Sequence, residues 1–506
     1  MKPDKNSFEI DGKSLTVERF IDIVYNGTEV RLTKKAEAAV KKCNNYLRQI
    51  LESGETVYGI NTGFGKLAKV RISDDKLEEL QTNLILSHAV GVGEPLSEVE
   101  TRGVMVLRAN CLSQGNSGVR PVVITTLLDM LNKGVHPLIP SRGSVGASGD
   151  LAPLAHLALT LIGKGKAKYR GKIYRGGTAL KKANITPLVL QPKEGLALIN
   201  GTQVMTALGL ISVAQAKRLA EWADLIGAAG TDAILGSAKI ADSGISRLRP
   251  HKGQKESAER IRKYLIRSEI NLSHRGCGKI QDNYSFRCMP QVHGAVRDAV
   301  AHVGKLLTIE ANSVTDNPLI FPDKKKVISG GNFHGEPVAL ALDYLSMGVA
   351  ELGNISERRT ATLIDSSMSN LPAFLAVEGG LNSGFMMLQV TAAALVNESK
   401  VLSHPASVDS IPTSANQEDH VSMGVTSALK LKQITKNTAG ILAIELLSSI
   451  QGIEFRRPLK SSRYIERMIQ TVRKDKKIPF VKKDHEFHQY VQKLTELILN
   501  EDPPVN

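Results

Sequence analysis

Residues 203–230 read QVMTALGLISVAQAKRLAEWADLIGAAG, and apolar residues recur in them at every third or fourth position. This spacing predicts a long α-helix. The apolar residues continue around almost its whole circumference, so the helix must be surrounded by other helices. The segments 97–115, 291–313 and 420–452 share the pattern. We therefore expect a mainly α protein built on a long central helical bundle.

The N-terminal part has a different pattern. Short β-like runs, SFEI at 7–10 and SLTVERFIDIV at 14–24, alternate with turns and helical pieces, and the glycine-rich YGINTGFGKL follows at 58–67. Such alternation predicts a smaller mixed part. We place it at residues 1–110 and expect it to pack against a helical domain formed by residues 111–506.

The composition is that of a large globular protein, with 506 residues of which 42% are hydrophobic. The N-terminal sequence lacks the apolar core of a signal peptide. A long uncharged stretch, 379–397, contains Asn, Ser, Gln and Thr, so we expect a buried helix there and no membrane span. Four cysteines without a CxxC pair or zinc-ligand spacing predict a cytoplasmic protein with no metal site.

The net charge of +15 raises the possibility of a nucleic-acid partner. Aromatic residues make up only 4% of the chain, and acidic residues are scattered through the same basic segments. This mixture is typical of solvated helix faces. We therefore expect no nucleic-acid binding.

The stretch GSVGASGDLAPLAHL at 143–157 has too much glycine for an ordinary connection. A nucleophile elbow requires G-x-S-x-G, but Asp150 stands where its second glycine belongs. A dinucleotide fingerprint requires G-x-G-x-x-G after a strand, which is absent. A carboxylate at the helix start would repel phosphate. One remaining interpretation is a flexible connection in which Asp150 caps the helix that follows.

A second interpretation uses the backbone. The nitrogen of Gly149 could attack the carbonyl carbon of Ala147 across Ser148, because glycine tolerates the bent backbone that this ring requires. Loss of water from the ring and from the Ser148 side chain would leave an electrophilic methylidene group. The residues alone leave both interpretations open.

The Ala147-Ser148-Gly149 triplet with its flanking residues resembles the signature of the aromatic amino acid ammonia-lyases, whose prosthetic group 4-methylideneimidazol-5-one (MIO) forms in this way. Further segments agree in order and spacing: YGINTGFG at 58–65, NLILSHAVGVGEPL at 83–96, ALINGTQ at 197–203, QDNYSFRCMPQVHGA at 281–295, NSVTDNPL at 312–319, GGNFHGEP at 330–337 and SANQEDHVSMG at 414–424. The resemblance spans about residues 50–450 and is closest to the histidine-specific branch of the family.

The resemblance implies a reaction, an architecture and an assembly. The reaction is the loss of ammonia from L-histidine to give trans-urocanate, with MIO and no dissociable cofactor. The architecture is the helical bundle shared with the aspartase and fumarase superfamily. The assembly is a homotetramer whose active sites draw residues from more than one subunit.

The resemblance also implies residue roles. Tyr58 acts as a catalytic base or proton shuttle, and Tyr284 handles a proton near the MIO. Arg287 offers the substrate carboxylate two parallel donors. Without the resemblance, a tyrosine at a loop edge and a lone arginine would be assigned to packing and to surface charge.

Three further pocket residues follow in the same way. Asn200 holds the MIO and the substrate amine, Phe333 packs over the prosthetic ring, and Gln281 adds a polar contact. By their residue types alone, Asn200 would be a turn residue and Phe333 a core residue.

Substrate choice and catalysis also involve His88 and Glu418, which by themselves could be a core histidine and an exposed carboxylate. Family members that act on phenylalanine or tyrosine usually carry Leu and Gln at these positions. An imidazole left unpaired in an apolar pocket costs about 1–3 kcal/mol per buried polar group, so a His and a Glu favour histidine as the substrate.

Four alternatives remain. A tyrosine or phenylalanine ammonia-lyase, or an MIO-dependent aminomutase, would use the same loop. The fumarase and aspartase signature G-S-S-x-M-P-x-K-x-N is absent, and the nearest string, SFRCMPQVHG, lacks its lysine. A structural or nucleic-acid-binding helical protein would not depend on Ser148.

Overall fold

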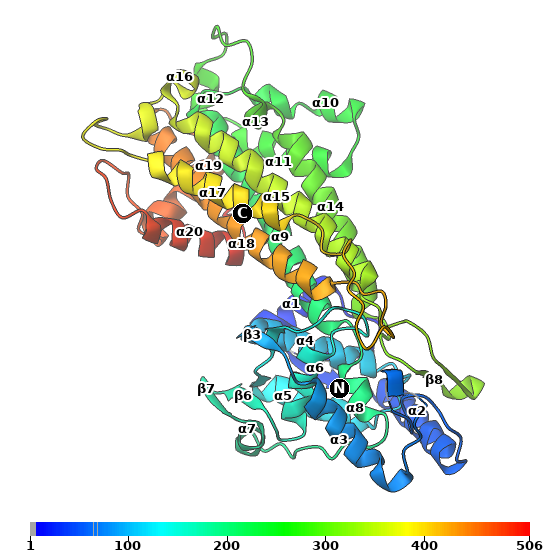
Figure 1. Ribbon diagram of the computed structural model, residues 1–506. Helices are drawn as coiled ribbons and strands as arrows, with labels where there is room; N and C mark the ends of the chain where they lie inside the picture. Colours follow the sequence, from blue (N-terminus) through cyan, green and yellow to red (C-terminus); the bar gives the residue numbers. More distant parts are fainter. Residues whose placement is uncertain (1–6, 64, 68, 506) are drawn as a thin grey trace. The chain divides into compact units, whose positions relative to one another are not determined.

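The computed structural model describes residues 7–63, 65–67 and 69–505 (Figure 1). The chain divides into two compact units. Unit 1 comprises Met1–Ile211, Gly304–Asp343 and Pro405–Leu429, and unit 2 comprises Ser212–Val303, Tyr344–His404 and Lys430–Asn506. This division differs from the boundary expected near residue 110, which falls within helix α4.

Four long helices carry the bundle: α9 (Gln203–Ala233), α14 (Met289–Ala311), α15 (Glu336–Ile364) and α18 (Gly424–Glu454). Four of the unit boundaries fall within these helices, and the fifth, between His404 and Pro405, lies in the segment before α18. The long helices expected at 203–230, 291–313 and 420–452 correspond to α9, α14 and α18, and the expected mainly α class is confirmed.

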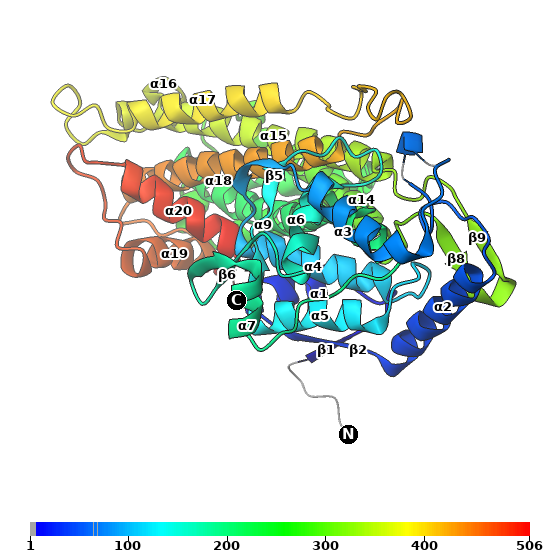
Figure 2. The same ribbon diagram turned by 60° about the horizontal axis from the view of Figure 1, so that its bottom comes forward.

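Glycines allow close packing of these helices within unit 2. A Cβ at Gly227 of α9 would clash with the Met289 side chain at the start of α14. A Cβ at Gly353 of α15 would lie 3.0 Å from the Ile441 side chain of α18. Because glycine presents no side chain, neighbouring helices approach closely at these points. The four helices lie side by side there (Figures 1 and 2).

Shorter helices complete unit 2. They are α10 (Ser243–Leu248), α11 (Lys252–Leu265), α12 (Glu269–Ser273), α13 (Tyr284–Arg287), α16 (Ser366–Ser369), α17 (Met386–Leu402), α19 (Arg463–Gln470) and α20 (His488–Asn500). Helix α17 lies along α15, where Gln389 donates a hydrogen bond of 2.6 Å to Glu357 (Figure 2).

Besides its parts of the four long helices, unit 1 contains the strands and eight shorter helices in its described residues. The helices are α1 (Val17–Ile21), α2 (Lys34–Glu52), α3 (Leu77–His88), α4 (Glu98–Leu112), α5 (Pro121–Lys133), α6 (Ala152–Leu161), α7 (Gly176–Lys182) and α8 (Glu194–Ile199). Local sequence sets their ends. Ser97 and Glu100 form a reciprocal capping box at the start of α4, and Gly134 ends α5 in a left-handed conformation.

The sheets of unit 1 are small. Strand β1 (Ser7–Ile10) runs parallel to β2 (Glu29–Leu32), with Ser7 opposite Glu29. The other pairs are antiparallel: β3 (Val92–Pro95) with β5 (Pro140–Arg142), β4 (Val135–Pro137) with β6 (Lys166–Tyr169), β6 with β7 (Lys172–Arg175), and β8 (Leu319–Phe321) with β9 (Lys326–Ile328).

The β-like interpretation of residues 14–24 is wrong. Thr16 caps α1 by accepting a hydrogen bond of 3.2 Å from the Arg19 amide, and a π-helical turn follows at Asp22–Asn26. The buried residues Phe20, Ile23 and Val24 have the three- and four-residue spacing of one helix face. A helix cap and helical spacing therefore outweigh the β-branched composition of this run.

The expected buried helix at 379–397 is also corrected. Residues 379–385 form turns, and α17 begins at Met386. Within one chain only Leu388, Ala392 and Ser399 of α17 are buried. Apolar residues are therefore exposed on the rest of this helix.

One helix in the described part of the chain, Glu336–Ile364, is long and apolar enough to cross a membrane. Its most apolar window is 61% buried within the chain. The core helix of a soluble protein meets the same criterion, so this helix does not assign the chain to a membrane.

Candidate active site

The glycine-rich loop connects β5 to α6 and lies against the residues just before α9. A Cβ at Gly149 would lie 2.5 Å from the Gly201 nitrogen, and Gly149 has a φ of +72°. The Asp150 amide donates a hydrogen bond of 2.7 Å to the Gly201 carbonyl. Only glycine therefore fits at position 149, both for its conformation and for this close approach.

The other side of the loop is held by segments distant in sequence. The Gly146 carbonyl accepts hydrogen bonds from the Ser422 hydroxyl at 2.9 Å and from the Gly335 amide at 3.2 Å. The Met423 amide donates to the Val145 carbonyl at 2.8 Å. The loop that carries Ala147 and Ser148 is thus fixed on both sides.

Asp150 does not cap the helix that follows it, contrary to the expectation from the sequence. Its carboxylate accepts hydrogen bonds from the amides of Val204 at 2.5 Å and Met205 at 3.4 Å, so it caps α9. Helix α6 begins after Leu151, which has a φ of +47°. Complete burial raises the pKa of Asp150 to about 8, although the two amide hydrogen bonds act in the opposite direction.

Asn200 is buried beside this contact and is held by three groups. Its side-chain amide donates to Asp316 at 3.2 Å and to the Asn317 carbonyl at 3.1 Å. Its own carbonyl accepts a hydrogen bond of 2.8 Å from Arg108. In the described part of the chain the Asn200 Oδ1 has no hydrogen-bond partner, although it is buried. An unsatisfied buried acceptor is costly, so this oxygen is suited to receive a donor from a ligand.

The groups that support Asn200 were not identified from the sequence. Arg108 is fully buried, and the buried Lys193 forms an ion pair of 2.9 Å with Asp316. The sequence contains one signal of such a buried group, a charged residue within an apolar run, as for Arg108 in VMVLRANCL at 104–112. Such a charge requires buried partners.

Tyr58 lies half-buried in a turn that leads away from α2. Its hydroxyl accepts a long hydrogen bond of 3.4 Å from the Gly65 amide. A Cβ at the neighbouring Gly59 would lie 3.1 Å from the Pro318 ring. Because Asn317 precedes Pro318 and binds Asn200, the Tyr58 turn belongs to the same region of unit 1.

His88 is the last residue of α3 and interacts electrostatically with Glu418. The His88 Nδ1 lies 2.9 Å from the Leu84 carbonyl, which can only accept, so Nδ1 carries the hydrogen and Nε2 is the acceptor of the neutral ring. Burial lowers the pKa of His88, while the Leu84 carbonyl and the Glu418 charge oppose this shift. The Glu418 carboxylate accepts a hydrogen bond of 2.7 Å from the Thr413 hydroxyl.

Phe333 lies half-buried in the turn before α15. The next residue, His334, stacks on His420 with ring centroids 5.7 Å apart, and its Nε2 lies 3.2 Å from the His420 carbonyl. The turn that carries Phe333 therefore adjoins the segment that contains Glu418.

The remaining three predicted residues lie together in unit 2. The Arg287 guanidinium lies over the Tyr284 ring, 5.0 Å from its centroid, and donates a hydrogen bond of 2.5 Å to Gln281. Tyr284 is 73% exposed, so its phenol is open to a ligand. We call Gln281, Tyr284 and the half-buried Arg287 the exposed triad.

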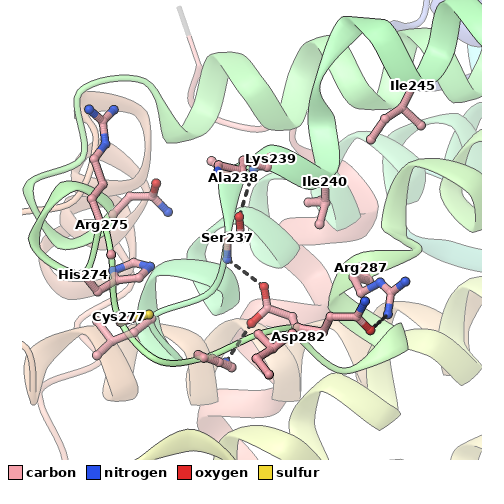
Figure 3. Close-up of a pocket in the computed structure, with 16 residues that line it drawn as sticks. Ser237, Ala238, Lys239, Ile240, Ile245, His274, Arg275, Cys277, Asp282 and Arg287 are labelled. Carbon is pink, nitrogen blue, oxygen red and sulfur yellow. Dashed lines mark hydrogen bonds and ion pairs between the residues drawn. The ribbon is translucent and has the colours of Figure 1, made fainter.

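The exposed triad borders a basic cavity of unit 2. Gln281 and Arg287 line a cavity of about 850 Å³ (Figure 3). Lys239, Arg275 and Lys279 also line it. Asp282 lines it too and forms an ion pair with Lys279, so the other cations leave the cavity with a net positive charge. Cations in a concave surface attract anions, so the cavity favours a ligand that bears a carboxylate.

The predicted site residues thus form two groups, one in each unit. In unit 1 the structure brings the Ala147-Ser148-Gly149 loop against Gly201, and His88 within electrostatic reach of Glu418. In unit 2 it brings together the exposed triad.

The chain is similar to known proteins over most of its length. The family model described as aromatic amino acid lyase matches residues 15–474. A histidine ammonia-lyase of Myxococcus xanthus is 49% identical over 97% of this chain and 96% of its own length. The solved histidine ammonia-lyase of Trypanosoma cruzi has a TM-score of 0.90 and 44% identity, covering 97% of this chain and 92% of that chain.

A second solved structure bears on the alternative activities. The tyrosine aminomutase of Streptomyces globisporus has a TM-score of 0.93 but only 34% identity, covering 97% of both chains. The fold is therefore shared between lyases and aminomutases, whereas sequence identity is higher with the histidine ammonia-lyases. With a family model that covers most of its length, this chain belongs to the aromatic amino acid lyase family.

Proposed function

We propose that this protein is an ammonia-lyase that converts L-histidine to trans-urocanate and ammonia. The observation that carries the proposal is the loop at Ala147-Ser148-Gly149, which packs against Gly201 where only glycine fits, in a chain 49% identical to a histidine ammonia-lyase. Electrostatic interaction between His88 and Glu418 supports histidine over phenylalanine or tyrosine.

The MIO group fits the residues present. Gly149 leaves its nitrogen unhindered, and the buried Asn200 Oδ1 offers an acceptor that the described chain leaves unused. The group supplies an electrophilic carbon that captures the substrate amine and makes it a better leaving group. In our proposal Ala147, Ser148 and Gly149 form it, and Asn200 accepts a hydrogen bond from the amine.

The remaining residues bind the substrate and move its protons. The Nε2 of His88 accepts an N–H of the substrate imidazole, and the Glu418 carboxylate accepts a proton or a hydrogen bond from the same ring. Tyr58 removes the β-proton and Tyr284 carries a second proton, while Phe333 covers the prosthetic ring. Arg287 binds the substrate carboxylate with two parallel donors, and Gln281 keeps that guanidinium in place.

We also propose that the enzyme is a cytoplasmic homotetramer with shared active sites. A single chain leaves apolar side chains exposed on α15 and α17, with Met347 at 47%, Met387 at 62% and Val390 at 47%. Exposed apolar side chains on two neighbouring helices support a subunit interface there. In the tetramer the exposed triad of one subunit completes the site of another.

The test is a direct assay of three substrates. The protein is incubated separately with L-histidine, L-tyrosine and L-phenylalanine, and the ultraviolet absorbance of each unsaturated acid is followed. We expect urocanate from histidine and little product from the others. Absence of urocanate would refute the proposal, and a β-amino acid product would identify an aminomutase instead.

A mass measurement tests the prosthetic group independently. Two waters are lost when the backbone-derived electrophile forms, so the intact mass lies about 36 Da below that of the encoded chain. Ser148→Ala restores at least one water and abolishes turnover. An active protein with the full encoded mass excludes MIO.

A further inference from the structure

The segment that carries the exposed triad is anchored by buried groups on one side. Its side chains alternate in exposure: Asp282 and Phe286 are 7% and 1% exposed, whereas Tyr284 is 73% exposed. A Cβ at Gly230 of α9 would lie 3.0 Å from the Phe286 ring, so Phe286 packs directly on that helix. The functional side chains thus point away from the side that is held.

The first anchor is Asp282. Its carboxylate accepts a hydrogen bond of 2.7 Å from the Ser237 amide and forms an ion pair of 2.7 Å with Lys279 (Figure 3). Asp282 therefore fixes the backbone on the N-terminal side of Tyr284 and Arg287.

The second anchor comes from one face of α15. Thr362 accepts a hydrogen bond of 3.1 Å from the Asn283 side chain, and Arg359 donates from Nη1 to the Ser285 carbonyl at 3.4 Å. Arg359 and Thr362 are three residues apart, so they lie on the same side of α15. These two contacts flank Tyr284 in the sequence, at residues 283 and 285.

Arg359 is itself held rigidly by a buried ion pair. Its Nε and Nη2 donate to both oxygens of Glu445, at 2.5 and 2.8 Å, and both side chains are fully buried. The Ser356 hydroxyl donates a further hydrogen bond of 2.6 Å to Glu445. A planar guanidinium with two parallel bonds has one orientation, which directs Nη1 toward Ser285.

Nη1 also contacts a buried histidine, which extends the network. It lies 3.2 Å from the Nε2 of His293, and because Nη1 can only donate, Nε2 must accept. The His293 Nδ1 therefore carries the hydrogen and donates to Asp224 at 2.8 Å. Burial lowers the pKa of His293, and the Arg359 charge lowers it further against the opposing effect of Asp224. The ring is thus neutral and is a fixed acceptor.

A network of this kind is an expensive way to stabilise a core. Replacing a buried ion pair by well-packed apolar residues often leaves the free energy of unfolding unchanged or raises it. The Arg359–Glu445 pair therefore points to a role in orienting the groups that Arg359 contacts, and not in stability alone. Among the described residues, the backbone group outside the network to which Arg359 donates is the Ser285 carbonyl, beside Tyr284.

We propose that Arg359 and Thr362 are positioning residues that hold the backbone at 283–285 and thereby orient Tyr284 and Arg287 toward the substrate. This inference rests on the proposed function, in which Tyr284 moves a proton and Arg287 binds the carboxylate. In this proposal neither positioning residue contacts the substrate, and both act through the segment at 283–285.

The sharpest test compares two threonines of α15. In Thr362→Val the hydrogen bond to Asn283 is lost, whereas Thr360→Val removes only a bond to the Ser356 carbonyl of the same helix. Both variants lose one intrahelical hydroxyl bond, because Thr362 also donates to the Arg358 carbonyl. The comparison therefore isolates the contact with the triad segment.

We expect Thr362→Val to lower kcat for L-histidine about fivefold relative to Thr360→Val, the effect of one neutral hydrogen bond. Both variants should have similar melting temperatures and the same MIO-dependent mass deficit. Equal kcat values in the two variants overturn the inference. Absence of histidine turnover in the wild-type protein refutes the proposed function instead.

A second pair of variants tests Arg359. Arg359→Lys keeps the charge but loses the planar fork, and we expect kcat to fall at least about tenfold. Arg457→Lys is the control for the loss of a planar fork, since Arg457, whose side chain is 29% exposed, also makes two parallel bonds, to Glu466 at 2.7 and 3.0 Å. Wild-type kcat in Arg359→Lys contradicts the inference, and if this variant does not fold the threonine pair decides.

Discussion

Replacement of Gly149 by alanine tests whether the close contact with Gly201 is essential for the prosthetic group. The added Cβ would lie 2.5 Å from the Gly201 nitrogen and closer still to the Gly201 carbonyl group. These are backbone atoms, which cannot rotate away as a flexible side chain would. The loop must therefore move away from Gly201.

The magnitude follows from two contributions. The left-handed conformation at φ +72° costs alanine about 1 kcal/mol. Forcing a methyl group into a filled space adds about 2 kcal/mol. Gly134→Ala is the matched control, because Gly134 has a φ of +71° but nothing within 4 Å of its Cβ position. The Gly134→Ala variant therefore has only the cost of the left-handed conformation.

The assay combines urea unfolding, intact mass and turnover of L-histidine. We expect Gly134→Ala to lose about 1 kcal/mol and to keep the mass deficit and the activity, and Gly149→Ala to lose about 3 kcal/mol. Gly149→Ala should also have the full encoded mass and no activity, because the displaced loop no longer brings its nitrogen to the Ala147 carbonyl. An active Gly149→Ala protein with the mass deficit would refute this reasoning.

Three other predictions follow from the structure. The pKa of Asp150 is raised from 3.8 to about 8, so between these pH values the folded chain keeps a proton that the unfolded chain releases. The free energy of unfolding should therefore fall as the pH rises from about 4 to about 8. Urea titrations should find a smaller fall in the Asp150→Asn variant, which has no carboxyl group to titrate. Glu418→Gln should lower kcat/KM for L-histidine by about 10- to 100-fold without a comparable loss of unfolding free energy, and an unchanged ratio would exclude Glu418 from imidazole binding. Met387→Glu places a charge on the exposed apolar face of α17 and should yield smaller species in sedimentation, whereas an intact tetramer would place the interface elsewhere.

Periodic patterns in the sequence predicted the long helices well. Residues 203–230 and 420–452 are apolar at helical spacing over many turns, and they form most of α9 and α18. The short N-terminal runs were harder, since residues 14–24 contain β-branched residues as well as a Thr16 cap. Local signals of similar strength compete there, and the Thr16 cap together with the helical spacing of the buried Phe20, Ile23 and Val24 decides between them.

The candidate site was predicted residue by residue from motifs, but its supporting groups were not. The ASG triplet and Asn200 stand in recognisable strings. Nothing near Arg108 in the sequence indicates that its guanidinium binds the Asn200 carbonyl. Asp150 was expected to cap the helix that follows it, but it caps α9 instead. The free amides at the start of α9 lie within hydrogen-bond distance of its side chain in the folded protein, although they are distant in sequence.

The sequence by itself determined the helical class, the glycine requirement around Ser148 and the chemical types available to the site, because these depend on spacing and local backbone freedom. Only the tertiary structure decided which groups meet. It placed Gly149 against Gly201, left the Asn200 Oδ1 without a partner in the described chain, and directed Arg359 to the Ser285 carbonyl. Such contacts join residues far apart in the chain, and they form because buried polar groups must find partners wherever the fold brings them.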